Sequence, residues 1–244
     1  MSLTITLATA GRILAQLRHD RRTLALLVGV PSVLMILLRY VIDDPASFDR
    51  LGPTLLGIFP FIVMFMVTSI TTQRERATGT LERLMAGPLG RFDLLLGYAL
   101  AFGAVAAAQV AVVLAISLTW LGLEVTGSVW LLVLVAVFDS LLGMALGLFF
   151  SAFARTEFQA VQFMPAVVLP QSLLCGLVVP RDAMASWLER LSDVMPLSYA
   201  VEAMQEVART GDVTGVLVRD ILIVAGCAVL ALILGAATLR RRTP

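Results

Sequence analysis

The sequence predicts an all-α polytopic membrane protein with six membrane-spanning helices. Of its 244 residues, 59% are hydrophobic and only 14% are charged, and the mean hydropathy is +0.94. Soluble globular domains contain about 25% charged residues. The apolar residues form runs of about 20, the length that crosses a bilayer as a helix, and they lack the alternation of a membrane barrel. We therefore interpret residues 1–244 as a single transmembrane domain.

Residues 1–22 are too polar to span a membrane, and from about residue 3 they predict an amphipathic helix that lies along the interface. Apolar residues recur there at three- and four-residue intervals, so they would share one face: Leu3, Leu7, Ala10, Leu14 and Leu17. A signal peptide is the competing interpretation. It is disfavoured because the basic cluster Arg18, Arg21 and Arg22 follows this segment and no A-x-A-like site ends the next one.

Six spans follow. We expect them at residues 24–42, 52–72, 94–120, 128–151, 159–179 and 217–239. Pro165 and Pro170 both lie in the fifth span. Because proline removes a backbone hydrogen bond, this span is predicted to be the most bent.

Arginine is divided unequally between the two membrane faces, and the chain contains no lysine. One face would hold twelve arginines: Arg12, Arg18, Arg21, Arg22, Arg74, Arg76, Arg83, Arg91, Arg155, Arg240, Arg241 and Arg242. The other would hold five: Arg50, Arg181, Arg190, Arg209 and Arg219. Basic residues favour the cytoplasmic side. We therefore expect both termini and the loop 73–92 in the cytoplasm. The absence of lysine is most simply explained by a GC-rich bacterial genome.

The densest group of charges stands in the loop 73–92, between the second and third spans. Arginines at 74, 76 and 83 alternate there with Glu75 and Glu82. This is enough for a short surface helix from about Arg74 to Met85, closed by Gly87-Pro88. We expect a soluble protein to dock on it.

Residues 180–216, between the fifth and sixth spans, predict an extracellular helical segment. One apolar stripe marks a short first helix: Met184, Trp187, Leu188, Leu191 and Val194. Pro196 would end that helix, and a second amphipathic stretch follows. We expect both helices against the outer leaflet; an ordinary structured loop is the alternative.

The sequence offers little for catalysis. His19 is the only histidine, so a catalytic triad or a multi-histidine metal site cannot form within one chain. A Walker A loop requires a lysine, which this chain lacks. Cys175 and Cys227 have no CxxC spacing and are interpreted as small core residues. We expect no enzyme activity, no cofactor bound by this chain and no nucleic-acid partner.

Four polar residues are predicted at membrane depth, along the substrate path or in helix packing: Gln109, Asp139, Gln162 and Gln171. Asp139 has the highest free energy of insertion into the membrane, at about 2.5–3.5 kcal/mol on insertion scales. Gly143 and Gly147 share its helix face, which indicates close approach of another helix. Asp139 would be a counter-charge for a cationic substrate or part of a hinge. Alternatively it is a polar clasp, for example to Gln109, or a protonated acid bonded to a backbone carbonyl.

Two motifs resemble the ABC-2-type permease family. The charged loop reads Glu75, Gly79-Thr80, Glu82, Leu84 and Pro88, which is similar to the family pattern E-x-x-x-G-T-x-E-x-L-x-x-x-P. After the fifth span, Gly176, Pro180 and the run Pro196-Leu197-Ser198-Tyr199 resemble a second family segment. Cys175 stands where serine is common.

The resemblance implies a type V exporter-like fold and an ATP-driven exporter whose permease binds a separate ATPase. Two ATPase copies, with their ATP and Mg²⁺, would serve two permeases, the second being a copy or a paralogue. The ATPase-coupling residues would be Arg74, Glu75, Arg76, Gly79, Thr80, Leu81, Glu82, Leu84 and Met85. The N-terminal helix would flank this contact, and the loop with Arg155 and Glu157 would be a lesser one.

The implied function is export of a hydrophobic drug, natural product or lipid-like substrate across the cytoplasmic membrane. The short chain resembles the daunorubicin-resistance-like drug exporter branch. ABC-2 export of a glycan or lipid-linked substrate is an alternative. An ion-gradient-driven transporter using Asp139 is another, although we detect no inverted repeat. A membrane enzyme built on Asp139 and Gln109 is disfavoured.

Overall fold

The structure, a computed structural model, describes residues 3–80, 83 and 90–238. Within these ranges the chain is helical and contains no strand. Six of the helices in the described ranges are long and apolar enough to cross a membrane. The all-α fold with six spans is therefore confirmed.

The helices follow one another in a simple order. They are α1 (Leu3–His19), α2 (Arg21–Ile42), α3 (Pro45–Ala77), α5 (Arg91–Thr119), α6 (Val129–Ser151), α7 (Glu157–Ser172), α8 (Ser186–Val194), α9 (Pro196–Arg209) and α10 (Gly215–Thr238). A π-helical turn, η1 (Leu173–Leu177), continues α7, and a 3-10 turn, η2 (Arg181–Ala183), precedes α8. The spans are α2, α3, α5, α6, α7 with η1, and α10.

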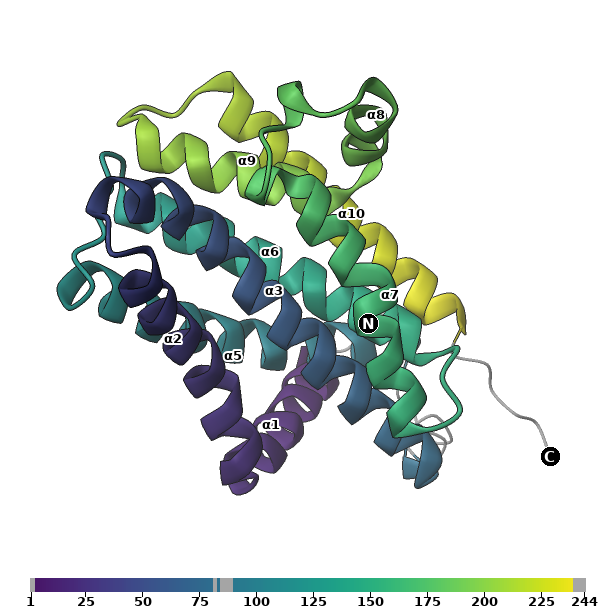
Figure 1. The fold of residues 1–244 in the computed structure, drawn as a ribbon. Helices are drawn as coiled ribbons and strands as arrows, with labels where there is room; N and C mark the ends of the chain where they lie inside the picture. Colours follow the sequence, from purple (N-terminus) through teal and green to yellow (C-terminus); the bar gives the residue numbers. More distant parts are fainter. Residues whose placement is uncertain (1–2, 81–82, 84–89, 239–244) are drawn as a thin grey trace.

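The bundle is built around α3 and α6, which make the most extensive helix–helix contact and cross the middle of the molecule (Figure 1). Gly143 and Gly147 permit this contact. A Cβ atom at either position would overlap the carbonyl oxygen of Phe61 or Phe65 in α3. The close approach expected at these two glycines is confirmed. The helices α2 and α10 are the least buried of the six spans, with 22% and 28% of their most apolar stretches buried.

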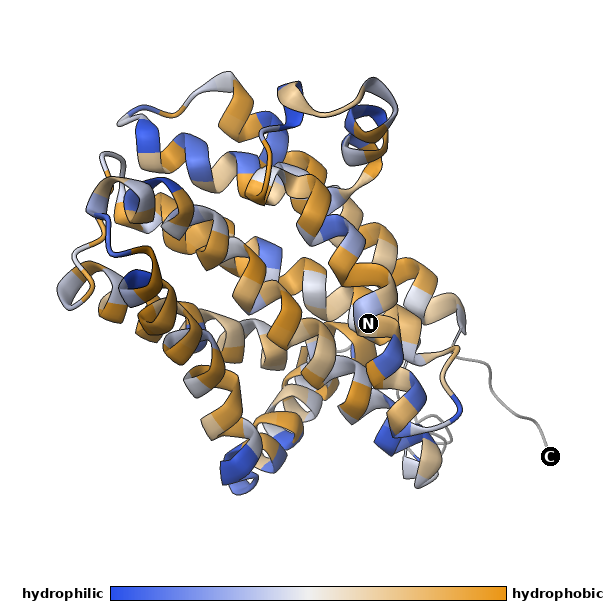
Figure 2. Ribbon diagram, viewed as in Figure 1, coloured by the Kyte–Doolittle hydropathy of each residue, from blue (hydrophilic) through white to orange (hydrophobic). Residues whose placement is uncertain are grey.

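Hydrophilic residues gather at the two ends of the bundle, and apolar residues cover the helices between them (Figure 2). One end, here called the α1 end, contains α1, the last turn of α3 and the beginnings of α5 and α7. The other, the α9 end, contains η2, α8 and α9 (Figure 1). This is the arrangement of a bundle that spans a bilayer.

Helix α3 is longer than predicted and corrects the expected surface helix. It has 33 residues and is therefore about 50 Å long, against about 30 Å for the hydrocarbon core. The run Arg74–Ala77 is its last turn, so a separate helix starting at Arg74 is wrong. Gln, Arg, Glu and Ala are good helix formers, so nothing interrupts α3 until Gly79, which has a φ of +71°.

The chain is helical again at Thr80 and Arg83. The amide of Arg83 donates to the carbonyl of Gly79, with 3.1 Å between nitrogen and oxygen. The remaining residues of the predicted surface helix lie outside the described residues: Leu81, Glu82, Leu84, Met85 and Gly87-Pro88.

Helix α1 is amphipathic, but its protein-facing side differs from the predicted leucine stripe. The buried residues are mostly small or polar: Thr6, Thr9, Ala10, Ile13 and Leu17. They pack against α5, where Gly97 leaves room: a Cβ there would lie 2.7 Å from the Cβ of Thr9. Leu3, Leu7 and Leu14 are exposed. The leucines thus form an outward face, as a helix at a membrane interface requires.

The segment after α7 bends and then folds over the end of the bundle. Gly176 in η1 has a φ of +95°. Helix α8 exposes Trp187 and Val194, as expected for a helix against lipid. For the second helix the position against the leaflet stays a prediction. Helix α9 buries Val201 and Met204 against α3, α6 and α10, because one whole side of it is apolar.

Candidate functional site

Glu75 is the centre of a polar cluster at the α1 end. It lies in the last turn of α3 and is only 7% exposed. Arg12 of α1 donates from Nη1 to its Oε1 over 3.0 Å. The hydroxyl of Tyr98, in α5, donates to its Oε2. This group of three, called the Glu75 brace below, joins α1, α3 and α5.

Arg74 points the other way, toward α7. Its Nε and Nη2 donate to the two carboxylate oxygens of Glu157 over 3.0 and 3.2 Å. The two side chains are 59% and 48% exposed. Exposed pairs contribute about 0–1 kcal/mol, so this one positions α3 against α7 more than it stabilises them. Glu157, predicted as a minor partner contact, is thus engaged within the chain.

The other coupling residues fall into distinct environments. Arg76 is half-buried, and its Nε and Nη2 have no hydrogen-bond partner among the described residues. Gly79 makes the left-handed turn that ends α3. Thr80 follows it, with its hydroxyl oxygen 3.0 Å from that of Thr78. Among the described residues that were predicted to couple, Glu75 is thus held inside the bundle, whereas Gly79 and Thr80 form a half-buried turn after α3.

Asp139 is fully buried in α6, and neither carboxylate oxygen has a hydrogen-bond partner in the described chain. It faces α3: a Cβ at Gly57 would lie 3.7 Å from its Oδ2. Gln109, in α5, is also fully buried, and its side-chain amide likewise lacks a partner among the described residues. The predicted clasp between the two is wrong, because neither side chain has a hydrogen-bond partner among the described residues. The bond from a protonated Asp139 to a backbone carbonyl stays a prediction.

The other two membrane-depth glutamines do not join Asp139. Gln171 is buried; its Nε2 donates to the carbonyl of Val167 over 3.1 Å, and its Oε1 accepts from the amide of Leu197 over 3.5 Å. It therefore links α7 to the start of α9. Gln162 is exposed on the outside of α7. The four predicted residues are not brought together into one site.

A charged cluster at the α9 end was not predicted. Arg181 pairs with Asp193 and, over 2.7 Å, with Glu202. Arg219 pairs with Glu202 over 3.1 Å. Both guanidinium groups lie near the ring of Tyr199, at 5.5 and 5.9 Å from its centroid. The cluster joins η2, α8, α9 and α10 and borders a polar cavity of about 850 Å³.

These charges are separated along the chain and come from four elements, so no local spacing indicates that they meet. The nearest signal was the segment ending at Tyr199, which was identified only through a resemblance.

The model of the ABC-2 type transporter family matches residues 5–208. The chain belongs to this family. The matched region begins in α1 and ends in α9, so it includes the Glu75 brace and Asp139. The resemblance inferred from the charged loop is thereby confirmed.

Three relatives illustrate the range of similar proteins. The chain is 30% identical over 155 residues to the probable multidrug ABC transporter permease YbhR of Escherichia coli strain K12, covering 64% of this chain and 42% of that protein. It is 26% identical over 190 residues to the probable multidrug ABC transporter permease YbhS of the same strain, covering 77% and 50%. It is 26% identical over 163 residues to ABC transporter G family member 20 of Dictyostelium discoideum, covering 67% and 22%. The matches thus span between about a fifth and a half of these relatives.

Proposed function

We propose that this ABC-2 family chain is the membrane subunit of an ATP-driven exporter. Its ATPase would be a separate protein, because this chain has no lysine for a Walker A loop. ATP and Mg²⁺ would be bound by that partner. Two permease chains, as copies or paralogues, would assemble with two ATPases.

The ATPase would dock at the α1 end. The arginine distribution supports a cytoplasmic position for this end and for both termini. The docking surface would begin at the turn formed by Gly79 and Thr80 and continue through Leu81, Glu82, Leu84 and Met85. Arg74 and Arg76 lie just before that turn, at the end of α3.

The observation that favours coupling most is the Glu75 brace at the end of an uninterrupted α3. Glu75 is held by Arg12 and Tyr98, so the last turn of α3 is fixed to α1 and α5. Motion applied after Gly79 would therefore move α1, α3 and α5 together. Because α3 packs along α6, the movement would reach the interior of the bundle. Such rigid-body movement is a common route for conformational change.

The substrate class that we propose is a hydrophobic drug, natural product or lipid-like molecule. The wide apolar surface of the spans and the names of the two E. coli relatives support it. An ABC-2 exporter of glycan or lipid-linked substrates remains the alternative within the family.

A gradient-driven transporter is the second candidate function, and one observation favours it. Asp139 is a fully buried carboxylate with no partner among the described residues, as an ion-binding carboxylate in a membrane helix would be. In that case transport would proceed without any ATPase and would follow an imposed proton or ion gradient.

The test begins with purification of the tagged chain from its native host, after mild crosslinking, and mass spectrometry of what copurifies. A stoichiometric protein with a Walker A motif is the expected result. Vesicles containing both proteins should then move a hydrophobic fluorescent dye only when ATP is present. Transport by the permease alone under a proton gradient would contradict the proposal and favour the Asp139 alternative.

Two charge reversals separate docking from folding. Glu82→Arg should leave the chain folded but release the ATPase, because it reverses a charge within the proposed docking surface. Glu189→Arg, at an exposed position on α8 at the opposite end, is the matched control and should leave the complex intact. Full assembly and transport by Glu82→Arg would rule out this docking surface.

A further inference from the structure

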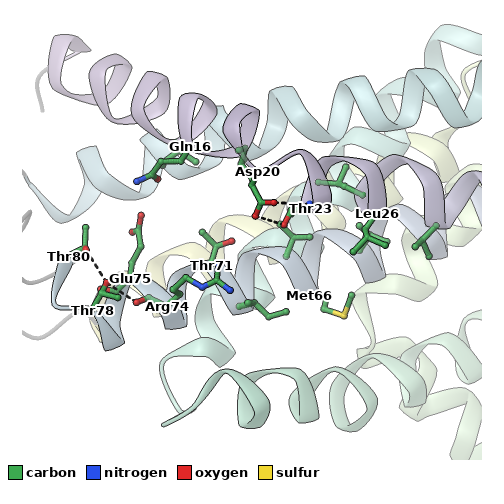
Figure 3. Close-up of a pocket in the computed structure, with 17 residues that line it drawn as sticks. Gln16, Asp20, Thr23, Leu26, Met66, Thr71, Arg74, Glu75, Thr78 and Thr80 are labelled. Carbon is green, nitrogen blue, oxygen red and sulfur yellow. Dashed lines mark hydrogen bonds between the residues drawn. The ribbon is translucent and has the colours of Figure 1, made fainter.

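Besides the polar cavity at the α9 end, a second cavity lies at the α1 end, between α1, α2 and α3. Its volume is about 470 Å³, within the range of about 300–1,000 Å³ typical of small-molecule sites. Figure 3 shows Asp20 and Thr23 on one side of it and Met66, Thr71 and Arg74 of α3 on the other. The cavity is thus open space bounded by three helices.

The lining changes from polar to apolar along the helices. Near the end of the bundle the polar lining residues are Gln16, Asp20, Thr23, Thr71, Arg74, Glu75, Thr78 and Thr80. Deeper along α2 and α3 the lining includes Leu26, Leu27, Val30, Val63, Met66 and Ile70. A ligand suited to this gradient has a hydrocarbon part and a polar end. The hydrocarbon part would lie between α2 and α3, because that is where the lining is apolar.

Three exposed arginines flank the polar side of the cavity. They are Arg18, Arg21 and Arg22, next in sequence to the lining residues Leu17, Asp20 and Thr23. None has an ion pair or a side-chain hydrogen bond within the described residues. Three such charges beside a membrane span attract anionic lipid headgroups.

Two acidic residues line this cavity, Asp20 and Glu75. Glu75 is held by Arg12 and Tyr98, and the carboxylate of Asp20 is engaged as well. It accepts from the amide of Thr23 over 3.1 Å and from the Thr23 hydroxyl over 2.7 Å. The hydrogen bond from that hydroxyl is the main reason why the pKa of Asp20 is lowered. The charged lining residues Asp20, Arg74 and Glu75 are thus all engaged within the chain, whereas the three flanking arginines are not.

The cavity also lies at the level of the membrane interface. Helix α1 exposes Leu3, Leu7 and Leu14, which suits a helix lying at the headgroup boundary. The span α2 begins directly after it, at Arg21. The three arginines thus lie where the phosphates of the same leaflet would be.

We propose that this cavity binds one anionic phospholipid, with an acyl chain between α2 and α3 and its phosphate at Arg18, Arg21 and Arg22. Helices α1 and α2 contact each other only slightly, so the lipid would fill the space between them. This role is independent of ATP and of the transported substrate.

Lipid binding to the purified full chain tests the proposal directly. The probes are phosphatidylglycerol and phosphatidylcholine with identical acyl chains, counted by native mass spectrometry during titration. We expect one phosphatidylglycerol to bind at least about ten-fold more tightly than phosphatidylcholine, because each nearby arginine contributes about five-fold. Equal binding of the two lipids would overturn the proposal.

The headgroup contact is tested by charge removal. The double variant Arg21→Gln with Arg22→Gln should weaken phosphatidylglycerol binding by about 25-fold. Its matched control, Arg190→Gln with Arg209→Gln, removes two exposed arginines at the opposite end and should change nothing. An unchanged affinity in the first variant would contradict the assigned headgroup position.

The acyl-chain contact is tested by filling the cavity. Leu26→Trp places a large side chain in the lining, whereas Leu37→Trp places one on the same face of α2, away from the cavity. Only Leu26→Trp should reduce binding, by about ten-fold or more. Equal behaviour of the two variants would rule out this cavity.

Two other occupants give distinct results, and each would overturn the proposal. If inorganic phosphate displaced the lipid at equal concentration, the site would bind anions that have no acyl chain. If Leu26→Cys formed crosslinked dimers of this chain in the membrane, a second copy would cover the cavity instead.

Discussion

Two carboxylates on the two inner helices differ in whether the fold provides them with partners. Glu75 in α3 accepts from Arg12 and Tyr98, and both of its carboxylate oxygens are used. Asp139 in α6 is more deeply buried, and neither oxygen has a partner among the described residues. Both side chains lie inside the bundle, so burial alone does not explain the difference.

The difference follows from where each residue lies along its helix. Glu75 is in the last turn of α3, where α1 and α5 bring polar groups to it. Asp139 is in the middle of α6, facing Gly57 where two helices are closely packed. A paired buried carboxylate can hold helices together, whereas an unpaired one is costly. Stability of this chain therefore accounts for Glu75 but not for Asp139.

The largest effect is expected where the helix contact beside Asp139 is broken. Gly143→Val would force the α6 backbone away from the carbonyl of Phe61, which should cost about 3 kcal/mol or more. Gly226→Val is the control, because a Cβ there meets nothing within 4 Å. The unfolding midpoints of the two variants are measured in detergent by heating, with the folded fraction followed by size-exclusion chromatography. Equal midpoints would mean that α3 and α6 are not tightly packed.

Removal of Glu75 should have the next largest effect. Glu75→Ala leaves Arg12 and Tyr98 without their shared acceptor, which should cost about 1–3 kcal/mol, less than for a fully buried pair because the Arg12 side chain is 27% exposed. Glu157→Ala removes an exposed pair and should cost no more than about 1 kcal/mol. If both variants unfold at the same temperature in the same assay, the Glu75 brace is not structural.

A third carboxylate, Asp20, provides a partly exposed reference for the comparison. Asp20→Ala removes the N-cap of α2 and should cost about 1 kcal/mol. The pKa of Asp20 is lowered from 3.8 by its bonds to Thr23, so its stabilising effect is present above about pH 4. The effect is lost as the pH falls through the lowered pKa.

The measurement is the difference in unfolding midpoint between Asp20→Ala and the unaltered chain, at pH 7 and again near pH 3. The difference should be smaller at the lower pH. A difference that grew on acidification would contradict the capping role.

The smallest stability effect is expected at Asp139. Asp139→Asn keeps the shape of the side chain and breaks no hydrogen bond within the described chain. The free energy of unfolding should therefore change by less than about 1 kcal/mol. A counter-charge role predicts that export of cationic substrates falls while export of neutral ones is retained. Equal losses for both substrate classes would contradict that role, and a large loss of stability would mean that Asp139 has an unrecognised structural partner.

The sequence by itself determined the spans, because length and hydropathy depend only on neighbours along the chain. Helix α6 (Val129–Ser151) lies within one residue of the expected 128–151, and the small-residue face at Gly143 was visible from helical spacing alone. The kink after Pro165 and Pro170 was indicated in the same way, and Gly176 completes it. Local chemistry also indicated the family, through the charged loop after α3.

Only the tertiary structure decided the environments of individual polar side chains. Glu75 and Arg74 are adjacent and both charged, yet Glu75 faces Arg12 and Tyr98 inside the bundle and Arg74 faces Glu157 outside it. A clasp between Asp139 and Gln109 was one alternative, but neither side chain has a hydrogen-bond partner among the described residues. The cluster around Tyr199 unites residues from four elements. Such contacts depend on how helices rotate and cross, which is set by packing summed over the whole bundle and has no signature in local spacing.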